Sequence, residues 1–152
     1  MRVLLDTGVL GQLCHPKDIQ SRPLASWLAG ILDRREWDVI IPEIADYELR
    51  RKLLHLARVS GQSTSKSLTR LDRLTETLTY LPLGTETMRK AADLWAEARA
   101  TGAPTAPPDA LDGDVLLAAQ ALLVSGLVVT KNRKHLSRYV AVSTWEELVP
   151  ST

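Results

Sequence analysis

The 152-residue chain has no phenylalanine, a single cysteine and no long apolar run. Without Phe, the core has to be filled by Leu, Val, Ile, Ala and four Trp residues. The single cysteine, Cys14, excludes an intrachain disulfide framework and favours a reducing cytoplasm as the working compartment. No apolar run reaches the ~18–20 residues that a bilayer requires, so we expect no membrane partner.

Internal repeats, low-complexity segments and interdomain linkers are also missing, which predicts a single domain over residues 1–152. The start of the chain lacks the basic region, long apolar segment and cleavage site of a secretory leader. The net charge is +1, so any argument for nucleic acid has to come from local patches. The apolar share of 45% and the charged share of 24% are typical of a soluble globular protein.

Short β-branched and leucine-rich runs alternate with segments of helical periodicity. They predict strands at residues 2–5, 39–41, 79–83, 127–130 and 140–142. They predict helices at residues 23–35, 43–59, 65–78, 85–100 and 116–124, and a closing helical turn at 145–148. Several strands are continuously apolar, which indicates a mainly parallel sheet covered on both faces and therefore a three-layer α/β/α sandwich.

Two finer expectations follow from the same patterns. Within the helix at 43–59, we expect Leu53, Leu54 and Leu56 to face inward together with Ile44 and Leu49. Residues 103–114 contain three prolines and three aspartates, which predicts a loop, and a loop of that length inside a compact domain is often functional.

Carboxylates stand at positions where open α/β sheets build their sites. Asp6 ends the first predicted strand, although it could equally cap the following helix. Glu43 is explained by the positive end of the helix that follows Pro42. Glu48 is five residues further on and points elsewhere, and spacing alone favours a surface pair with Lys52.

A second group of acids lies in and after the proline-rich loop. Asp109, Asp112 and Asp114 fall within six residues and repel one another unless a cation or a distant base intervenes. Asp112 could be the N-cap of the next helix, with Asp114 in its first turn, since helix polarity favours acids there. Both readings, capping and ligation, stay open from spacing alone.

Polar and basic residues follow the strand at 127–130. Thr130, Lys131 and Asn132 could support an acidic site or bind phosphate, or they could form an ordinary turn. No acid occurs from residue 131 to residue 138, where the cations are Lys131, Arg133, Lys134 and Arg138. A second basic run, at residues 50–52, lies on the other side of the proposed acids, as a cleft for a polyanion would require.

Carboxylates that gather at one sheet edge cannot all stay ionised unaided. Such oxygen ligands suit Mg²⁺ or Mn²⁺, whereas the isolated histidines and Cys14 do not have zinc-site spacing. A metal ion held by carboxylates points to phosphoryl chemistry.

In these features the chain resembles the PIN domain family, the fold of VapC-type toxin ribonucleases. The resemblance covers nearly the whole chain in order. It rests on Leu4-Leu5-Asp6-Thr7, on Ile41-Pro42 through Tyr47-Glu48-Leu49-Arg50, on Asp114-Val115-Leu116-Leu117-Ala118-Ala119, on Val129-Thr130-Lys131-Asn132, and on Val142-Ser143-Thr144-Trp145-Glu146-Glu147-Leu148. It implies a metal centre formed by Asp6, Glu48 and Asp114, and so replaces the surface reading of Glu48.

Around that centre, the resemblance leaves two positions to explain. Family members often carry an aspartate where this chain has His135, and Asp112 is a candidate extra ligand or proton carrier that could supply the missing charge. The residues expected to position ligands or contact the substrate are Thr7, Thr130, Lys131, Asn132 and Arg133.

The hypothesis that follows is a Mg²⁺- or Mn²⁺-dependent endoribonuclease. The resemblance further implies a toxin with a small cognate antitoxin, and a homodimer. The alternative is a catalytically weakened PIN-fold module that binds RNA or protein. A receiver-like phosphoacceptor is disfavoured, because strand one ends in a lone acid and Pro42 follows the next strand.

Overall fold

A computed structural model describes residues 1–15, 21–61, 65–101 and 108–149, and of residues 108–111 only the backbone. The strands in these residues are β1 (Arg2–Leu5), β2 (Asp38–Pro42), β3 (Thr79–Leu81), β4 (Leu127–Val129) and β5 (Val142–Ser143). The helices are α1 (Thr7–Cys14), α2 (Ser21–Arg34), α3 (Glu43–Val59), α4 (Lys66–Thr77), α5 (Thr85–Ala100), α6 (Pro108–Leu123) and α7 (Arg133–Leu136), followed by the 3-10 turn η1 (Trp145–Glu147).

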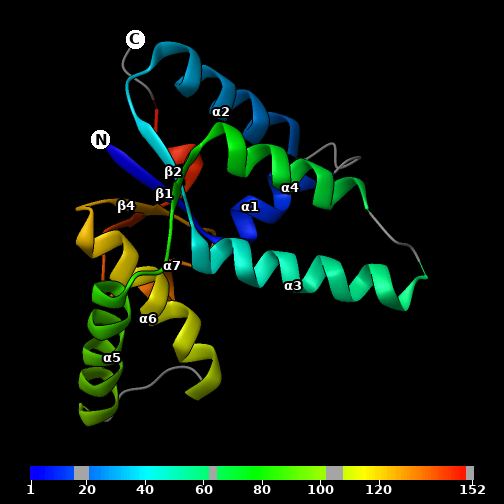
Figure 1. Ribbon diagram of the computed structural model, residues 1–152. Coiled ribbons are helices and arrows are strands. Elements are labelled where there is room, and N and C mark those ends of the chain that lie inside the picture. Colours follow the sequence, from blue (N-terminus) through cyan, green and yellow to red (C-terminus); the bar gives the residue numbers. More distant parts are fainter. Residues whose placement is uncertain (16–20, 62–64, 102–107, 150–152) are drawn as a thin grey trace.

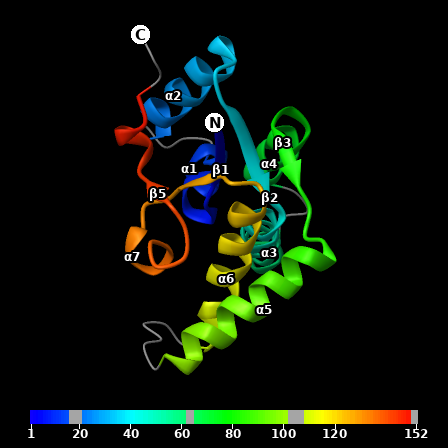
Figure 2. The same ribbon diagram turned by 90° about the vertical axis from the view of Figure 1, so that its left-hand side faces the viewer.

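The described strands form one sheet in the order β3-β2-β1-β4-β5, and each neighbouring pair is parallel. Figure 1 labels the three inner strands, and Figure 2 labels β3 and β5. The first strand of the chain is therefore central. Leu4 of β1 pairs with Ile40 of β2 on one side and with Val128 of β4 on the other. This arrangement confirms the predicted parallel sheet.

Alternation along β1 places side chains in two separate cores. Val3 and Leu5 are fully buried with residues of α1, α2, α3 and α4, whereas Leu4 is fully buried on the opposite face with residues of α5 and α6. Figures 1 and 2 show these two helical layers on either side of the strands. The predicted three-layer α/β/α sandwich is confirmed.

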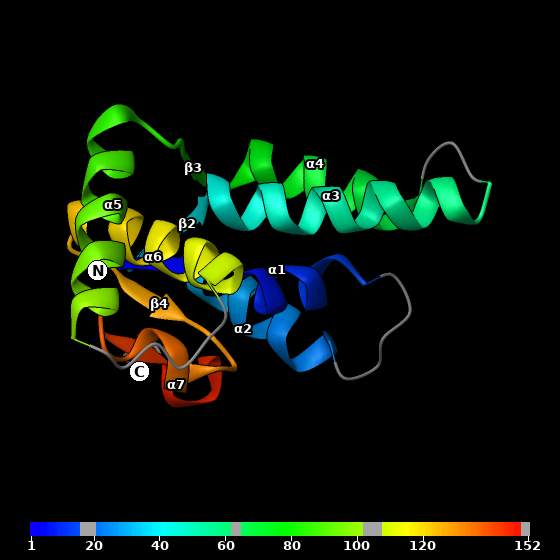
Figure 3. The same cartoon turned by 90° about the horizontal axis from the view of Figure 1, so that it is seen from below.

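Helix α3 is anchored at its start and extends away from the sheet at its end. Pro42 is its N-cap, and Ile44 and Leu49 near its start are buried. Figure 3 shows α3 and α4 side by side, running outward beyond the strands. The expectation that Leu54 and Leu56 face inward is wrong, since they are 40% and 52% exposed. The distal half of α3 has no sheet beneath it.

A polar network holds the first turns of α3 against β3 and α4. Asp46 is buried, accepts a 2.8 Å hydrogen bond from the Tyr80 hydroxyl and forms a 3.0 Å salt bridge with Arg50. Arg50 also pairs with Asp72 of α4 at 2.7 Å. Glu43 accepts a 3.0 Å bond from the backbone N–H of Leu83 and a 3.3 Å bond from Tyr80. Through these contacts, Glu43 and Asp46 stabilise the packing of α3 against its neighbours.

Helix α6 begins earlier than expected. Residues 108–114 belong to its first turns, so the predicted loop at 103–114 is wrong for that part, and residues 103–107 lie outside the described residues. Pro108 occupies the first helical position, where proline is favoured, and acids in the following turns suit the positive end of a helix. Asp112 therefore lies inside the helix and is not its N-cap.

The fully buried Gln120 of α6 links three elements. Its side-chain oxygen accepts a 3.3 Å bond from the backbone N–H of Ile44, at the start of α3. Its amide nitrogen donates a 2.8 Å bond to the carbonyl of Leu81, at the end of β3. Because the donor at a helix start and the acceptor at a strand end are both satisfied, α6 is fixed in position relative to α3.

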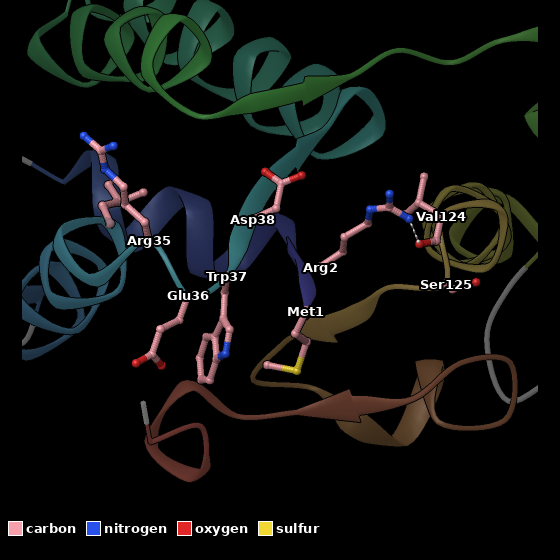
Figure 4. A pocket seen from close by; sticks show the side chains of 9 residues that line it. Met1, Arg2, Arg35, Glu36, Trp37, Asp38, Val124 and Ser125 are labelled. Atoms are coloured by element: carbon pink, nitrogen blue, oxygen red, sulfur yellow. Dashed lines mark hydrogen bonds between the residues drawn. The ribbon is translucent and has the colours of Figure 1, made fainter. Parts of the chain in front are cut away.

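A hollow of about 780 Å³ lies at the amino ends of β1 and β2 (Figure 4). Arg2 in its wall donates a 3.0 Å bond to the carbonyl of Val124. Arg35 and Ser125, which follow α2 and α6, also line it and adopt left-handed backbone conformations (φ 55° and 53°). It lies at the amino ends of the strands, whereas Asp6 follows the carboxyl end of β1.

Among the described helices, none is long and apolar enough to cross a membrane.

Candidate active site

The candidate site forms where the chain changes direction across the sheet. Strands β2 and β3 extend the sheet on one side of β1, and β4 and β5 extend it on the other. The crevice outside the carboxyl ends of such a pair of strands is where open α/β sheets bind ligands. Leu5 of β1 and Val129 of β4 are paired there, and the backbone N–H of Asp6 donates a 3.0 Å bond to the Val129 carbonyl.

The carboxylate of Asp6 is held from both sides. One oxygen accepts a 2.7 Å bond from the backbone N–H of Thr7, which confirms that Asp6 caps α1. The other accepts a 2.6 Å bond from the hydroxyl of Thr130, a fully buried side chain. That hydroxyl in turn accepts a 3.0 Å bond from the backbone N–H of Asn132. Each Asp6 oxygen keeps a lone pair for a further ligand.

Glu48 reaches this place from the second turn of α3. Its carboxylate accepts a 3.2 Å bond from the Thr7 hydroxyl and lies 3.9 Å from the guanidinium of Arg51, so its ion-pair partner is Arg51 and not the expected Lys52. Burial raises the pKa of Glu48, the Thr7 bond and Arg51 oppose that rise, and the negative charges of Asp6 and Asp114 add to it.

Asp114 reaches it from α6. Burial raises the pKa of Asp114, the positive charge of His135 opposes the rise, and the charge of Asp6 adds to it. Asp6, Glu48 and Asp114 thus affect one another electrostatically, although they come from β1, α3 and α6. The structure brings together the three acids that the resemblance selected.

The other predicted residues divide into two groups. Thr7 and Thr130 bond directly to the acids, and Asn132, the N-cap of α7, donates its backbone N–H to the Thr130 hydroxyl. Asp112 is exposed and lines a separate hollow with Met88 and Trp95 of α5, and it is not among the charges that shift the pKa of Glu48 or Asp114.

Two of the predicted cations are also placed. Arg133 forms a salt bridge with Glu147 of η1, which holds α7 to the end of the chain. The Arg133 bond is the main cause of a lowered pKa of Glu147. Lys131 is exposed in the turn between β4 and α7.

His135 lies in α7, at the position where the resemblance led us to expect an aspartate. It is close enough to Asp114 for its charge to oppose the rise in the pKa of that acid. Its Nδ1 atom is buried and has no hydrogen-bond partner among the described residues. The site therefore has an imidazole at residue 135 in place of the expected carboxylate.

Basic residues continue from Glu48 along the outward half of α3. Arg51, Lys52, His55 and Arg58 are exposed and follow Glu48 at helical spacings of three, four, seven and ten residues, which puts them on one side of the helix. No acid occurs from residue 49 to residue 60. Arg50 belongs instead to the network with Asp46 and Asp72. We call residues 51, 52, 55 and 58 the α3 basic stripe.

The donor set fits a hard cation in its chemistry, since all three acids offer carboxylate oxygens and two of them have raised pKa values. In the metal-free structure these acids do not form a complete ligand shell. In the part of the chain that the structure describes, no three His, Cys, Asp or Glu side chains are placed to hold a metal ion. Ion binding would require these side chains to move together.

Sequence reasoning missed two residues of this region. Gly113, directly before Asp114, faces the Glu48 carboxylate, and Gln120 fixes α6 to α3. Gly113 falls within the predicted loop at 103–114, and its only signal is a glycine beside a candidate ligand. A glutamine in the apolar run after Asp114 was the signal for Gln120.

Comparisons with known proteins agree with this architecture. The crystal structure of VapBC2 from Rickettsia felis bound to a promoter DNA fragment contains a similar chain, with a TM-score of 0.69, 18% identity and coverage of 95% of this chain and 99% of that chain. FitAcB from Neisseria gonorrhoeae gives a TM-score of 0.66 and 23% identity, with coverage of 96% and 99%. VapBC-1 from nontypeable Haemophilus influenzae gives 0.67 and 19%, again with coverage of 96% and 99%. At these identities the likeness shows the fold.

The comparison with curated proteins gave no match. The model of the PIN domain, in contrast, matches residues 3–141, a span that contains β1 except for Arg2, the strands β2 to β4, and Asp6, Glu48 and Asp114. The chain therefore belongs to the PIN domain family.

Proposed function

We propose that this PIN domain protein is a divalent-metal-dependent endoribonuclease. The observation that carries the proposal is the placement of Glu48 between the other two acids: it accepts a bond from the hydroxyl of Thr7, next to Asp6, and faces Gly113, next to Asp114. Burial and the negative charge of Asp6 raise the pKa values of Glu48 and Asp114. Acids held together at that cost to the metal-free fold are typical of a site that a cation completes.

In this proposal Mg²⁺ or Mn²⁺ is held by Asp6, Glu48 and Asp114. When bound, the ion supplies an activated water and neutralises charge on the phosphodiester. Thr130 and the backbone N–H of Thr7 fix the orientation of the Asp6 carboxylate, and the Thr7 hydroxyl holds one oxygen of Glu48. The protein thus positions two of the three acids before any ligand arrives.

RNA is the proposed substrate, and the α3 basic stripe is its proposed path. The stripe begins at Arg51, beside Glu48, and reaches Arg58 after ~10 Å from Arg51 at 1.5 Å per residue. A row of exposed cations leading away from an acidic centre lets a phosphate backbone approach acids that would otherwise repel it. The side chain of Lys131 adds a further exposed cation beyond β4.

The partners are part of the same proposal. VapBC-1, VapBC2 and FitAcB are among the structures that are similar to this chain, and another similar structure is described as a toxin–antitoxin complex from Klebsiella pneumoniae. We therefore propose a cognate antitoxin, a homodimer and action in the cytoplasm. Induced expression should arrest growth, and Asp114→Asn should relieve that arrest at equal protein levels.

RNA cleavage tests the enzyme directly. Purified wild-type protein is incubated with total cellular RNA in Mn²⁺, in Mg²⁺ and in EDTA, and new 5′ ends are mapped by sequencing. We expect cleavage at defined positions with either metal and none in EDTA. Asp6→Asn and Asp114→Asn should lose cleavage while keeping the wild-type circular dichroism spectrum. Full metal-dependent cleavage by Asp6→Asn would show that the site is misassigned.

A second candidate function is a PIN-fold binding module with weakened catalysis. Two observations favour it: His135 stands where family members often have an acid, and the acids of the described chain form no ready ligand shell. A Mn²⁺ titration separates the two candidates. A wild-type protein that neither binds Mn²⁺ nor cleaves RNA, yet binds RNA, is the binding module.

A further inference from the structure

Gly113 leaves a gap that the carboxylate of Glu48 fills. A Cβ atom built on Gly113 would lie 3.1 Å from Oε2 and 3.3 Å from Oε1 of Glu48, closer than ordinary van der Waals contact. The two residues come from different helices, α6 and α3. The contact therefore joins the helix that carries Asp114 to the helix that carries Glu48.

Glycine is an unfavourable choice for this position on grounds of stability. Gly113 lies inside α6, and a glycine in a helix interior lowers the folding equilibrium constant by about two- to fivefold relative to alanine. Gly30, inside α2, offers a direct comparison, because a Cβ there would meet nothing within 4 Å. At Gly113, unlike at Gly30, a specific neighbour explains the missing side chain.

We propose that Gly113 is a positioning residue, whose bare Cα lets the Glu48 carboxylate lie against α6 beside Asp114 so that both acids can serve one cation. This inference rests on the proposed function, because it assigns the gap to the metal centre. It predicts that a side chain at residue 113 moves one of the acids away from the other two.

The surroundings decide which group has to move. Gln120 fixes α6 to the start of α3 through Ile44 and to β3 through Leu81, so the two helices cannot easily separate. The Glu48 carboxylate is the end of a longer side chain, held by the Thr7 hydroxyl and beside Arg51. An added methyl group therefore displaces the carboxylate, weakening the Thr7 contact, and leaves the backbone in place.

The test compares two alanine variants of the full chain. In EDTA, Gly30→Ala should raise the folding equilibrium constant by about two- to fivefold, as relief of a helix glycine does. Gly113→Ala should gain less than that, because its methyl group meets Glu48. Mn²⁺ binding by calorimetry should be unchanged in Gly30→Ala and weaker by roughly tenfold in Gly113→Ala, the usual effect of disturbing a group that orients a ligand.

A larger side chain and a shorter acid sharpen the comparison. Gly113→Leu, also a good helix former, should lower Mn²⁺ affinity more than Gly113→Ala does. Adding Glu48→Asp to Gly113→Ala withdraws the carboxylate from the methyl group and should recover part of the lost affinity. A structural role of Gly113 alone would not produce this rescue.

A double-mutant cycle in EDTA tests the contact without any metal. In a Glu48→Ala background, Gly113→Ala should gain as much stability as Gly30→Ala does, since the carboxylate is gone. Equal gains in the wild-type background, or unchanged Mn²⁺ affinity in Gly113→Ala, would overturn the inference while leaving the nuclease proposal intact. A wild-type protein without Mn²⁺ binding would overturn the proposed function, and the cycle would then still report on the contact itself.

Discussion

The hydroxyl of Thr130 donates a 2.6 Å hydrogen bond to the carboxylate of Asp6, although 124 residues separate them in the chain. This bond joins the residues that follow the carboxyl ends of β1 and β4. It also leaves Asp6 with a fixed orientation, since the Thr7 N–H holds its other oxygen. The pair explains why a threonine that is fully buried follows a strand.

Removal of this hydroxyl should weaken both the fold and the site. Thr130→Val keeps the shape of the side chain and removes a bond to a charged group, which costs about 1.5–3 kcal/mol of unfolding free energy. Urea denaturation in EDTA measures this loss, and calorimetry with Mn²⁺ should show weaker binding. Thr130→Ser retains the hydroxyl and is the matched control. A Thr130→Val protein as stable as wild type would contradict the structural role of the bond.

The raised pKa values of Glu48 and Asp114 predict how stability depends on pH. A carboxyl whose pKa is higher in the folded state contributes stability below its ordinary pKa, and this contribution is lost as pH rises through the raised value. The metal-free protein is therefore weakened by these two acids at pH 7. Glu48→Gln and Asp114→Asn should each raise the unfolding free energy at pH 7 in EDTA.

The gain from these two variants should shrink towards about pH 4, where free carboxyls are themselves half protonated. Asp112→Asn, an exposed neighbour on α6, is the control and should change stability little at either pH. Destabilisation by both Glu48→Gln and Asp114→Asn at pH 7 would mean that the surroundings stabilise the two ionised acids, the opposite of what their raised pKa values predict.

Replacing His135 by the acid that family members often carry should have opposite effects with and without metal. His135→Asp replaces an imidazole that opposes the rise in the pKa of Asp114 by a further negative charge, so the metal-free protein should be less stable. Mn²⁺ should bind more tightly, by roughly tenfold, because affinity at carboxylate sites rises with ligand charge.

His135→Asn separates loss of the imidazole from gain of a carboxylate. Its Mn²⁺ affinity should stay near or below the wild-type value. If His135→Asn and His135→Asp bind Mn²⁺ equally well, the charge at residue 135 does not contribute to metal binding.

Gln120 should be among the positions whose substitution lowers the unfolding free energy most. Gln120→Leu leaves the N–H of Ile44 and the carbonyl of Leu81 without their partner, at about 1–3 kcal/mol for each buried group. Urea denaturation measures the loss. Leu122→Ala, on the same helix but 38% exposed, should cost less. Equal losses in the two variants would show that the buried amide has no special role.

The layers and sheet were predictable because their signals are local. Apolar runs such as residues 3–5 indicated buried parallel strands, and helical periodicity placed the covering helices. The start of α6 was missed because proline and aspartate suggest a loop, whereas both are also favoured in a first helical turn. The exposure of Leu54 and Leu56 could not be read from periodicity, since it depends on where the sheet ends.

The site was predictable only in part. Asp6 and Thr130 stand at strand ends, where chemistry in α/β sheets is expected. Glu48 was not recognisable from spacing, which favoured Lys52 as its partner, and only the family resemblance selected it. Its environment depends on Thr7 and Gly113, which are 41 and 65 residues away in the chain, so no local pattern contains it.

The central position of β1 also determines when the residues of the site can come together during synthesis on the ribosome. Along the chain, Asp6 and β1 precede β2, which pairs with β1, and β3, which pairs with β2, whereas β4 on the other flank of β1 leaves the exit tunnel later than these strands. Until it does, the acid has no Thr130 and no His135 beside it. Under the proposed activity, an unfinished molecule is therefore incompetent to cut the RNA of the machine that is making it.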